Sequence, residues 1–229
     1  MSQSLREKRL GSLAAEIESC RRCPRLVSWR EQVAREKRAA YAHEDYWGRP
    51  LAGFGDPQAR IAILGLAPAA HGGNRTGRVF TGDRSGDFLF AALHRAGLAN
   101  RAESIRAGDG LRVSDTWICA AVRCAPPANR PTPAERDSCL PFTRAEFAEL
   151  RDLRVVVCLG AFAWDAAARL FGIRPRPRFA HGAEHPGSPA LLASFHVSQQ
   201  NTFTGRLTAA MLDDVLARAR RMAQLADER

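Results

Sequence analysis

Four of the six cysteines in this 229-residue chain are spaced like the ligands of a metal centre. Cys20 and Cys23 form a C-x-x-C pair followed directly by Pro24, whereas Cys124 and Cys139 lie outside the strand-like runs, around a proline-rich loop. Four thiolates make a complete tetrahedral sulfur set, which suits either zinc or an iron–sulfur cluster. The spacing of the cysteines alone does not distinguish these two metals.

The other two cysteines belong to apolar runs and are expected to be buried, inert thiols. Cys119 lies in WICAAV and Cys158 in VVVCLG. A thioredoxin-like redox role for Cys20 and Cys23 is disfavoured, because their motif does not open a helix after a first strand. The N-terminal residues lack the apolar core of a signal peptide, so we expect a cytoplasmic, reducing environment without structural disulfides.

Two loops carry the remaining candidate residues, and each follows a short apolar run. The run at 61–64 opens into a long glycine-rich loop that extends to Asp87, and the run at 191–195 ends at His196. The first loop lacks both common phosphate-binding motifs, so an ordinary nucleotide cradle is excluded. Loops that follow parallel strands meet at the carboxyl edge of the sheet, where such folds bind ligands. The sequence therefore predicts one pocket, with His196 facing the glycine-rich loop.

Polar side chains follow His196 at Ser198 and at three further positions. Side chains of this type can enter a DNA groove or fill the gap that an extruded base leaves. We therefore expect DNA contacts from Gln199, Gln200 and Asn201. A lone histidine after a strand also occurs as a capping or packing residue, and that alternative stays open for His196.

Strand-like and helix-like patterns alternate along the chain. Strands are expected at 61–64, 113–119, 154–159 and 190–195. Helices are expected at 4–19, 25–40, 86–97, 133–150, 161–171 and 205–226. This alternation predicts an α/β fold, with a mostly parallel sheet covered on both faces. Segments 43–57 and 174–189 read as loops, and no linker divides the chain, so residues 1–229 are expected to form a single domain.

The charge balance predicts a polyanionic partner. The chain has 34 Lys and Arg against 24 Asp and Glu, a formal net charge of +10. Only Lys8 and Lys37 are lysines, so the surplus is arginine. An arginine-rich composition encoded by GC-rich DNA is the alternative explanation. There is no run of 18 apolar residues, so no membrane span is expected.

Three long motifs resemble the uracil-DNA glycosylase superfamily, and in particular its family 5, or type b. They are GLAPAAHGGNRTGRVFTGDRSGD, AVRCAPP and HVSQQNTFTGRLT, and the likeness extends from about Cys20 to the last helix. The C-x-x-C…C-x14-C set is similar to the cluster ligands of the iron–sulfur branches. The resemblance implies a three-layer α/β/α sandwich with a central four-stranded sheet, a 4Fe-4S cluster, and removal of uracil from double-stranded DNA.

The resemblance also implies a role for individual residues. His196 would contact the leaving base, Phe80 would stack on the extruded base, and Asp83 would be the acidic catalytic residue. The Ala69–Ala70 turn and Gly82 would line the pocket. The cluster ligands would be Cys20, Cys23, Cys124 and Cys139, which would tie the N-terminal helices, residues 1–45, to the rest of the chain.

Two departures from the superfamily pattern bear on the chemistry. The turn at 67–70 offers no polar side chain for the attacking water, which fits family 5 and shifts that role to Asp83, with Asn74 and Asp87 as alternatives. Val197 follows the histidine where relatives usually have proline, which restores a main-chain N–H.

The cations next to these motifs suit the DNA backbone. The expected phosphate contacts are Arg75, Arg78, Arg84 and Arg206, for which a solvated surface role is the alternative.

Three other functions compete with uracil removal from DNA. They are a non-enzymatic, metal-stapled DNA-binding module, a zinc nucleobase deaminase, and a glycosylase of the same fold that prefers hypoxanthine or mismatched thymine. The deaminase signature, H-x-E before P-C-x-x-C, is absent. A monomer suffices for chemistry on one lesion.

Overall fold

A mixed six-stranded sheet forms the centre of the protein, for which a computed structural model describes residues 3–225. Its four inner strands are parallel and lie in the order β3 (Thr116–Ala120), β2 (Ile61–Gly65), β4 (Val155–Leu159) and β6 (Ala190–Ser194). Nearly every residue of these strands is buried, as expected of parallel strands covered on both faces. The predicted four-stranded parallel core is therefore confirmed.

Two antiparallel edge strands, each of two residues, extend this core. β1 (Phe54–Gly55) pairs with β3, and β5 (Glu184–His185) pairs with β6. They correct the prediction that 43–57 and 174–189 are loops throughout. Two residues are too few to display an alternating pattern, so the sequence offers no signal for either strand.

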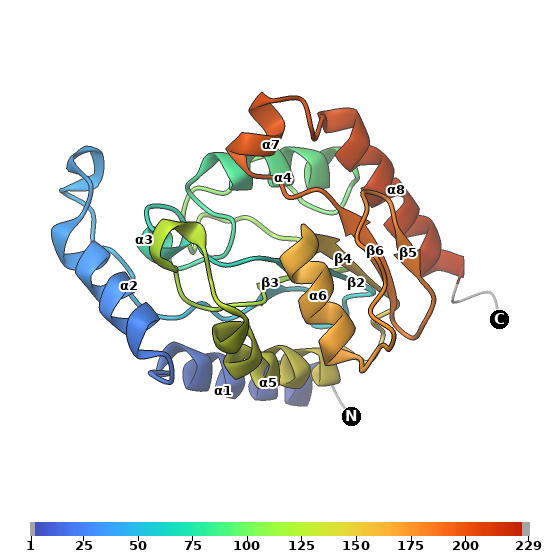
Figure 1. Cartoon of the computed structure of the whole chain (residues 1–229), viewed down its shortest axis with the longest axis horizontal. Helices are drawn as coiled ribbons and strands as arrows, with labels where there is room; N and C mark the ends of the chain where they lie inside the picture. Colours follow the sequence, from blue (N-terminus) through green and yellow to red (C-terminus); the bar gives the residue numbers. More distant parts are fainter. Residues whose placement is uncertain (1–2, 226–229) are drawn as a thin grey trace.

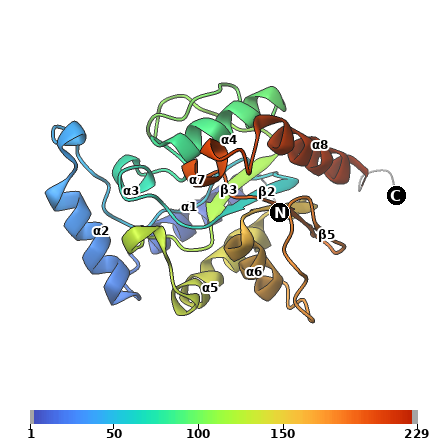
Figure 2. The same cartoon turned by 45° about the horizontal axis from the view of Figure 1, so that its top comes forward.

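Helices cover both faces of the sheet and give the predicted three layers (Figures 1 and 2). On β2, Ile61 and Ile63 point into the core shared with α4 and α8, whereas Ala62 and Leu64 point into the core shared with α5 and α6. The helices are α1 (Gln3–Glu18), α2 (Pro24–Glu36), α3 (Gly73–Thr76), α4 (Arg84–Arg95), α5 (Pro133–Glu149), α6 (Ala161–Leu170), α7 (Gln199–Phe203) and α8 (Ala209–Leu225). Single 3₁₀ turns occur at Ala39–Tyr41 and Pro127–Asn129.

The predicted helices occur within a few residues of their expected bounds, with one difference at the C-terminus. The helix expected at 205–226 is divided into the short α7 and a later start of α8 at Ala209. Between them Gly205 has a left-handed φ of +72°, which interrupts helical geometry. Residue 226 lies outside the described residues.

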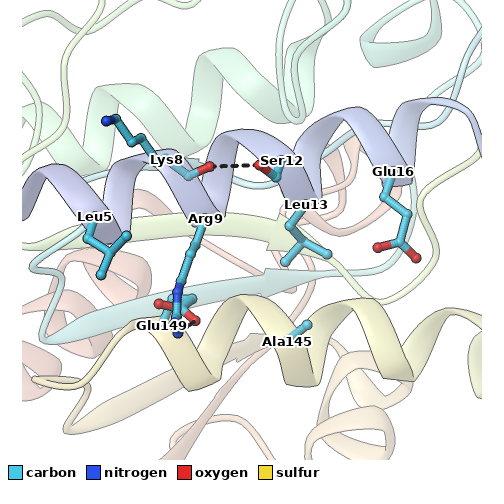
Figure 3. Close-up of a pocket in the computed structure, with 8 residues that line it drawn as sticks. All are labelled: Leu5, Lys8, Arg9, Ser12, Leu13, Glu16, Ala145 and Glu149. Carbon is cyan, nitrogen blue, oxygen red and sulfur yellow. Dashed lines mark hydrogen bonds and ion pairs between the residues drawn. The ribbon is translucent and has the colours of Figure 1, made fainter. Parts of the chain in front are cut away.

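The N-terminal helix α1 lies beside α5 (Figure 1), and its Leu10 is buried in the core that α5 and α6 share with the sheet. A hollow of about 510 Å³ runs between the two helices, with an ion pair of 3.3 Å between Arg9 Nη1 and Glu149 Oε1 on its wall (Figure 3). None of the predicted site residues lines this hollow, so the candidate chemistry lies elsewhere. Across residues 3–225, every helix is too short or too polar to cross a membrane.

Candidate active site

The loop after β2 is held by main-chain hydrogen bonds around Ala69. The carbonyl of Ala69 accepts the N–H of Gly72 at 3.3 Å and the N–H of Asn74 at 3.1 Å. This arrangement closes a tight turn at Ala69–Ala70 and leads directly into α3. The turn presents main chain and methyl groups, as its sequence predicts.

Phe80 is buried within this loop in a strained backbone conformation. Its φ is +52°, which is uncommon for a residue other than glycine and tends to occur at functional sites. Two glycines make room for it: a Cβ atom at Gly65 would lie 2.5 Å from Phe80 Cζ, and one at Gly86 would overlap the Phe80 carbonyl oxygen. The Phe80 and His196 ring centroids are 6.3 Å apart. The fold therefore brings the two predicted residues together from separate loops.

Asp83 caps the N-terminus of α4 and is largely buried. Its Oδ1 accepts the Gly86 N–H at 3.0 Å. Burial raises the pKa of the Asp83 carboxyl group, although main-chain N–H groups of Gly86 and Ser85 and the charge of Arg75 oppose that rise. The carboxylate also packs on the Gly72 main chain, where a Cβ atom would come within 2.8 Å of Asp83 Cγ. The acid thus links α4 to the base of the glycine-rich loop.

His196 follows β6 and is held in a hydrophobic setting. Burial lowers the pKa of His196 to about 4, so its imidazole is neutral at pH 7. Its carbonyl accepts a hydrogen bond of 2.8 Å from Asn201 Nδ2, and the following Val197 is fully buried in the core. A neutral imidazole has one N–H to donate and one nitrogen to accept.

Four of the residues predicted to contact DNA lie at the surface beside this site. Gln199 and Gln200 are exposed on α7, and Arg84 is exposed at the start of α4. The Arg206 guanidinium lies 4.7 Å from the centroid of the Phe195 ring and is also exposed. These four side chains are accessible at the surface.

Arg75 and Arg78 have a different environment from the one expected of phosphate ligands. Arg75 donates to the carbonyls of His71 and Gly82 and pairs with Glu44, and its side chain is 9% exposed. Arg78, equally buried, pairs with Asp109 at 2.7 Å. Their donors are used inside the protein, so these two arginines shape the glycine-rich loop. The sequence shows their charge but gives no signal of their burial.

Two asparagines also make internal contacts. Asn74, only 1% exposed, donates from Nδ2 to the Arg30 carbonyl at 3.2 Å, which directs its amide toward α2. Asn201 uses its amide to support His196. Neither side chain is presented to a DNA groove or a base in this structure.

Cys20 and Cys23 lie between α1 and α2, Cys124 follows β3, and Cys139 lies in α5; none of the six cysteines forms a disulfide. Cys23 packs with Cys124 and Cys139 around Leu26 and Val122, and Arg30 Nη1 lies 3.0 Å from Cys124 Sγ. Burial raises the pKa of Cys124 to about 12, and the Arg30 charge opposes that rise.

The described residues contain no three Cys, His, Asp or Glu side chains close enough to hold one metal ion. The sulfur ligands of a single zinc ion lie about 2.3 Å from the metal, and no such grouping occurs in this part of the chain. The other cysteines, Cys119 and Cys158, are fully buried in β3 and β4, as predicted.

Three features of the site were not recognised in the sequence. Phe203 on α7 is 71% exposed and Ile105 is 56% exposed, and both lie next to the Gly82–Arg84 segment. An apolar residue inside a polar stretch is the signal that could have identified them. Ala128 and Asn129 both adopt left-handed φ angles, +52° and +55°, in the loop after β3. Strain of this kind tends to occur at functional sites but leaves no mark in the sequence.

The fold is an α/β sandwich whose loops at the carboxyl edge of the sheet bring together an aromatic ring and a neutral imidazole, with a largely buried acid at the start of α4. A sequence profile of the uracil DNA glycosylase superfamily matches residues 52–220, and the chain belongs to that superfamily.

The relatives of the chain include several curated glycosylases. The type-5 uracil-DNA glycosylase of Mycobacterium tuberculosis is 57% identical over 216 residues, covering 92% of this chain and 81% of that protein. The type-5 enzyme of Thermus thermophilus is 53% identical over 212 residues, covering 91% and 96%. A type-4 uracil-DNA glycosylase of Thermotoga maritima is similar over a shorter stretch, with 35% identity over 114 residues.

Proposed function

We propose that this protein is a uracil-DNA glycosylase that extrudes uracil from double-stranded DNA and hydrolyses its N-glycosidic bond. The observation that carries the proposal is the convergence of Phe80, Asp83 and His196 on the two loops at the carboxyl edge of the sheet. Membership of the superfamily and the names of the type-5 relatives support it. We propose that it acts as a monomer, in the cytoplasm of a bacterium and on nucleoid DNA.

The base pocket uses shape and main chain to hold the extruded base. A base inside a duplex shields its glycosidic bond, so the nucleotide must leave the stack. Phe80 offers a flat apolar face to the base, and the Ala69–Ala70 turn and Gly82 supply the walls. Because Phe80 is fixed by the close approach of Gly65 and Gly86, its ring is oriented before the base arrives.

His196 stabilises the leaving group. Cleavage of the glycosidic bond leaves negative charge on a uracil oxygen, and a preorganised N–H donor aimed at that oxygen lowers the barrier. The neutral imidazole can donate such a hydrogen bond without giving up a proton that must later be recovered. Its apolar setting strengthens the bond, because little water competes for it.

Asp83 acts on the other side of the bond that breaks. As a carboxylate, it can orient the attacking water or stabilise the positive charge that develops on the sugar. Asp87 is more exposed, and the Asn74 amide faces α2, so Asp83 is the stronger of the three candidates.

The DNA-binding surface surrounds this pocket. Arg84 and Arg206 would contact phosphates, and Gln199 and Gln200 would approach the bases or sugars. Phe203 and Ile105 would place apolar side chains against the nucleotides on either side of the extruded base. The net charge of +10 favours the approach of the protein to DNA from any direction.

A 4Fe-4S cluster would be held by the thiolates of Cys20, Cys23, Cys124 and Cys139. It would connect the N-terminal helices, residues 1–45, to the segment from 124 to 139. The gathered thiols and the buried Arg30 beside them fit such a group. The cluster would be structural, since hydrolysis of a glycosidic bond requires no electron transfer. Visible absorption, iron and sulfide content of anaerobically purified protein test this. A colourless protein with stoichiometric zinc would contradict it.

Uracil release from defined duplexes tests the proposed activity. Duplexes with one uracil, hypoxanthine or mismatched thymine are incubated with the protein, and the free base and the abasic strand are measured. We expect free uracil and an abasic site, with slower release or none from the other two substrates. Binding to the uracil duplex without base release would favour a non-enzymatic module, and faster release of another base would reassign the substrate.

A further inference from the structure

Arg30 is a buried cation whose guanidinium faces sulfur. It lies in α2 and is 2% exposed. Its Nη1 donates to Cys124 Sγ at 3.0 Å and its Nη2 donates to the Cys20 carbonyl at 3.2 Å, so one side chain joins both cysteine pairs. Its Nε is also buried and has no partner among the described residues.

This arrangement calls for an anionic partner. The acid nearest to Arg30 is Glu31, with 3.9 Å between Nη2 and Oε1 and a side chain that is one-third exposed. A neutral thiol is a weak acceptor, whereas a thiolate bound to metal is a charged one. A buried arginine without a close anion is costly. A sulfur-ligated cluster would supply the missing negative charge at Cys124.

The opposite side of Arg30 contacts the base pocket. The Arg30 carbonyl accepts from Asn74 Nδ2 at 3.2 Å, and the Asn74 N–H donates to the Ala69 carbonyl at 3.1 Å. Asn74 is 1% exposed, and its carbonyl accepts the Gly48 N–H at 3.0 Å. Hydrogen bonds therefore join Cys124 to the Arg30 side chain, the Arg30 main chain to the Asn74 side chain, and the Asn74 main chain to the Ala69–Ala70 turn.

We propose that Arg30 and Asn74 form a strut between the iron–sulfur cluster and the Ala69–Ala70 turn, so that the cluster fixes the shape of the base pocket. The proposal rests on the cluster proposed above. In it Arg30 and Asn74 are positioning residues: they touch neither base nor water. Hydrogen bonds to cluster sulfurs raise the reduction potential and protect the cluster, which gives Arg30 a measurable effect of its own.

Four variants separate the two ends of the strut. Arg30→Met keeps roughly the length of the side chain but removes all of its N–H donors. Arg30→Lys keeps the positive charge but loses the planar guanidinium group and its fixed donor geometry. Asn74→Ala removes the side-chain bond to the Arg30 carbonyl, keeps the main-chain bond to Ala69, and leaves Arg30 and the cysteines in place. Arg35→Met is the matched control, because Arg35 is exposed on the same helix.

The readouts are the half-life of the visible cluster absorption in air and hydrogen exchange of peptides covering residues 69–76. We expect Arg30→Met to shorten the half-life several-fold, Arg30→Lys to have a smaller effect, and Asn74→Ala to have none. Asn74→Ala loses the side-chain bond to the Arg30 carbonyl, so exchange in 69–76 should be about fivefold to tenfold faster, as expected for the loss of one buried hydrogen bond. Arg30→Met keeps its main-chain carbonyl, so exchange there should rise by less, through the loss of the two side-chain bonds that hold α2 to the cysteines.

The possible results distinguish failure of the strut proposal from failure of the proposed glycosylase activity. An iron-free wild-type protein would overturn the cluster and the strut together, yet uracil release could still be observed. An iron-loaded, active wild type, with Arg30→Met and Asn74→Ala indistinguishable from Arg35→Met, would overturn the strut alone. If Arg30→Met does not fold, the proposal is tested with Arg30→Lys and Asn74→Ala instead. Hydrogen exchange of residues 69–76 in Asn74→Ala that equals the wild-type exchange would contradict the proposal.

Discussion

At the scale of single residues, the Asp83 side chain makes two contacts at once. It caps α4 through Gly86, and it holds a buried carboxyl group against Gly72. Because the cap fixes the side chain, the acid is oriented before substrate binds. Gly72 is required for this geometry, since any side chain there would occupy the space of the carboxylate.

Gly72→Ala should therefore displace Asp83 and slow base release by about 100-fold, the effect expected when a catalytic group moves by about 1 Å. Gly11→Ala is the control, because a Cβ atom at Gly11 meets nothing within 4 Å. Single-turnover uracil release from a duplex measures the effect. Equal rates for Gly72→Ala and Gly11→Ala would show that the position of Asp83 is unimportant.

The pH dependence of the rate follows from Asp83 and His196. Asp83 must be ionised, and burial raises its pKa above 3.8; His196 must be neutral, and burial lowers its pKa to about 4. Both groups lose a proton as pH rises, so the single-turnover rate should rise from pH 4 and become level near neutrality. Asp87 adds to the rise in the pKa of Asp83, and Arg75 opposes it. A rate that rises as pH falls below 6 would contradict these assignments.

At the scale of elements, the loop at 101–112 is fastened to the glycine-rich loop by one buried ion pair. The Asp109 carboxylate accepts from Arg78 and from the N–H groups of Ile105, Arg106 and Leu111. These bonds hold the pKa of Asp109 well below its ordinary value. The pair places Ile105 beside Gly82.

Asp109→Asn should lower the free energy of unfolding by about 3–5 kcal/mol, because it leaves the buried Arg78 charge without its partner. Urea denaturation measures this, with Asp45→Asn as the control, since Asp45 is fully exposed. The wild-type advantage comes from a carboxyl group with a lowered pKa. It is therefore present at neutral pH and should shrink as pH falls below about 4. A difference that stays constant down to pH 3 would exclude this ion-pair origin.

The short helix α7 carries the most exposed large apolar side chain of the described residues, Phe203. Phe203→Ala should weaken binding to an abasic-site duplex by about tenfold, because base–aromatic stacking contributes about 1–3 kcal/mol. Leu5→Ala on α1 is the control for the loss of an exposed apolar residue away from the site. Fluorescence anisotropy gives both dissociation constants, and equal values would remove Phe203 from the DNA surface.

The elements were more predictable from the sequence than the site. The four parallel strands and the long helices follow from apolar runs and periodicity, whereas β1 and β5 are too short to leave a pattern. Phe80, Asp83 and His196 were predicted as site residues because parallel strands bring their loops to one edge and because the motifs resemble a known superfamily; their roles stay a prediction. The environments of Arg75, Arg78 and Asn74 depend on burial and on distant partners, which charge and residue type do not show.

At the scale of the whole molecule, two parts with different origins form one site. The loops at the carboxyl edge of the sheet carry the proposed reacting groups, while Cys23, before α2, packs with Cys124 of the segment that follows β3 and with Cys139 of α5. The arginines also fall into two groups. Arg84 and Arg206 are exposed, whereas Arg30, Arg75 and Arg78 are buried and hold loops together. Net charge alone therefore overstates the cations available to DNA.

The most direct test is single-turnover release of uracil from a duplex by wild-type protein, Asp83→Ala and His196→Ala, with folding verified by circular dichroism and thermal unfolding. The wild-type protein should release uracil and leave an abasic site, and each variant should be slower by about 100-fold or more. Rates within about threefold of wild type in both folded variants would contradict the assigned site, because a group acting in the transition state contributes far more than that.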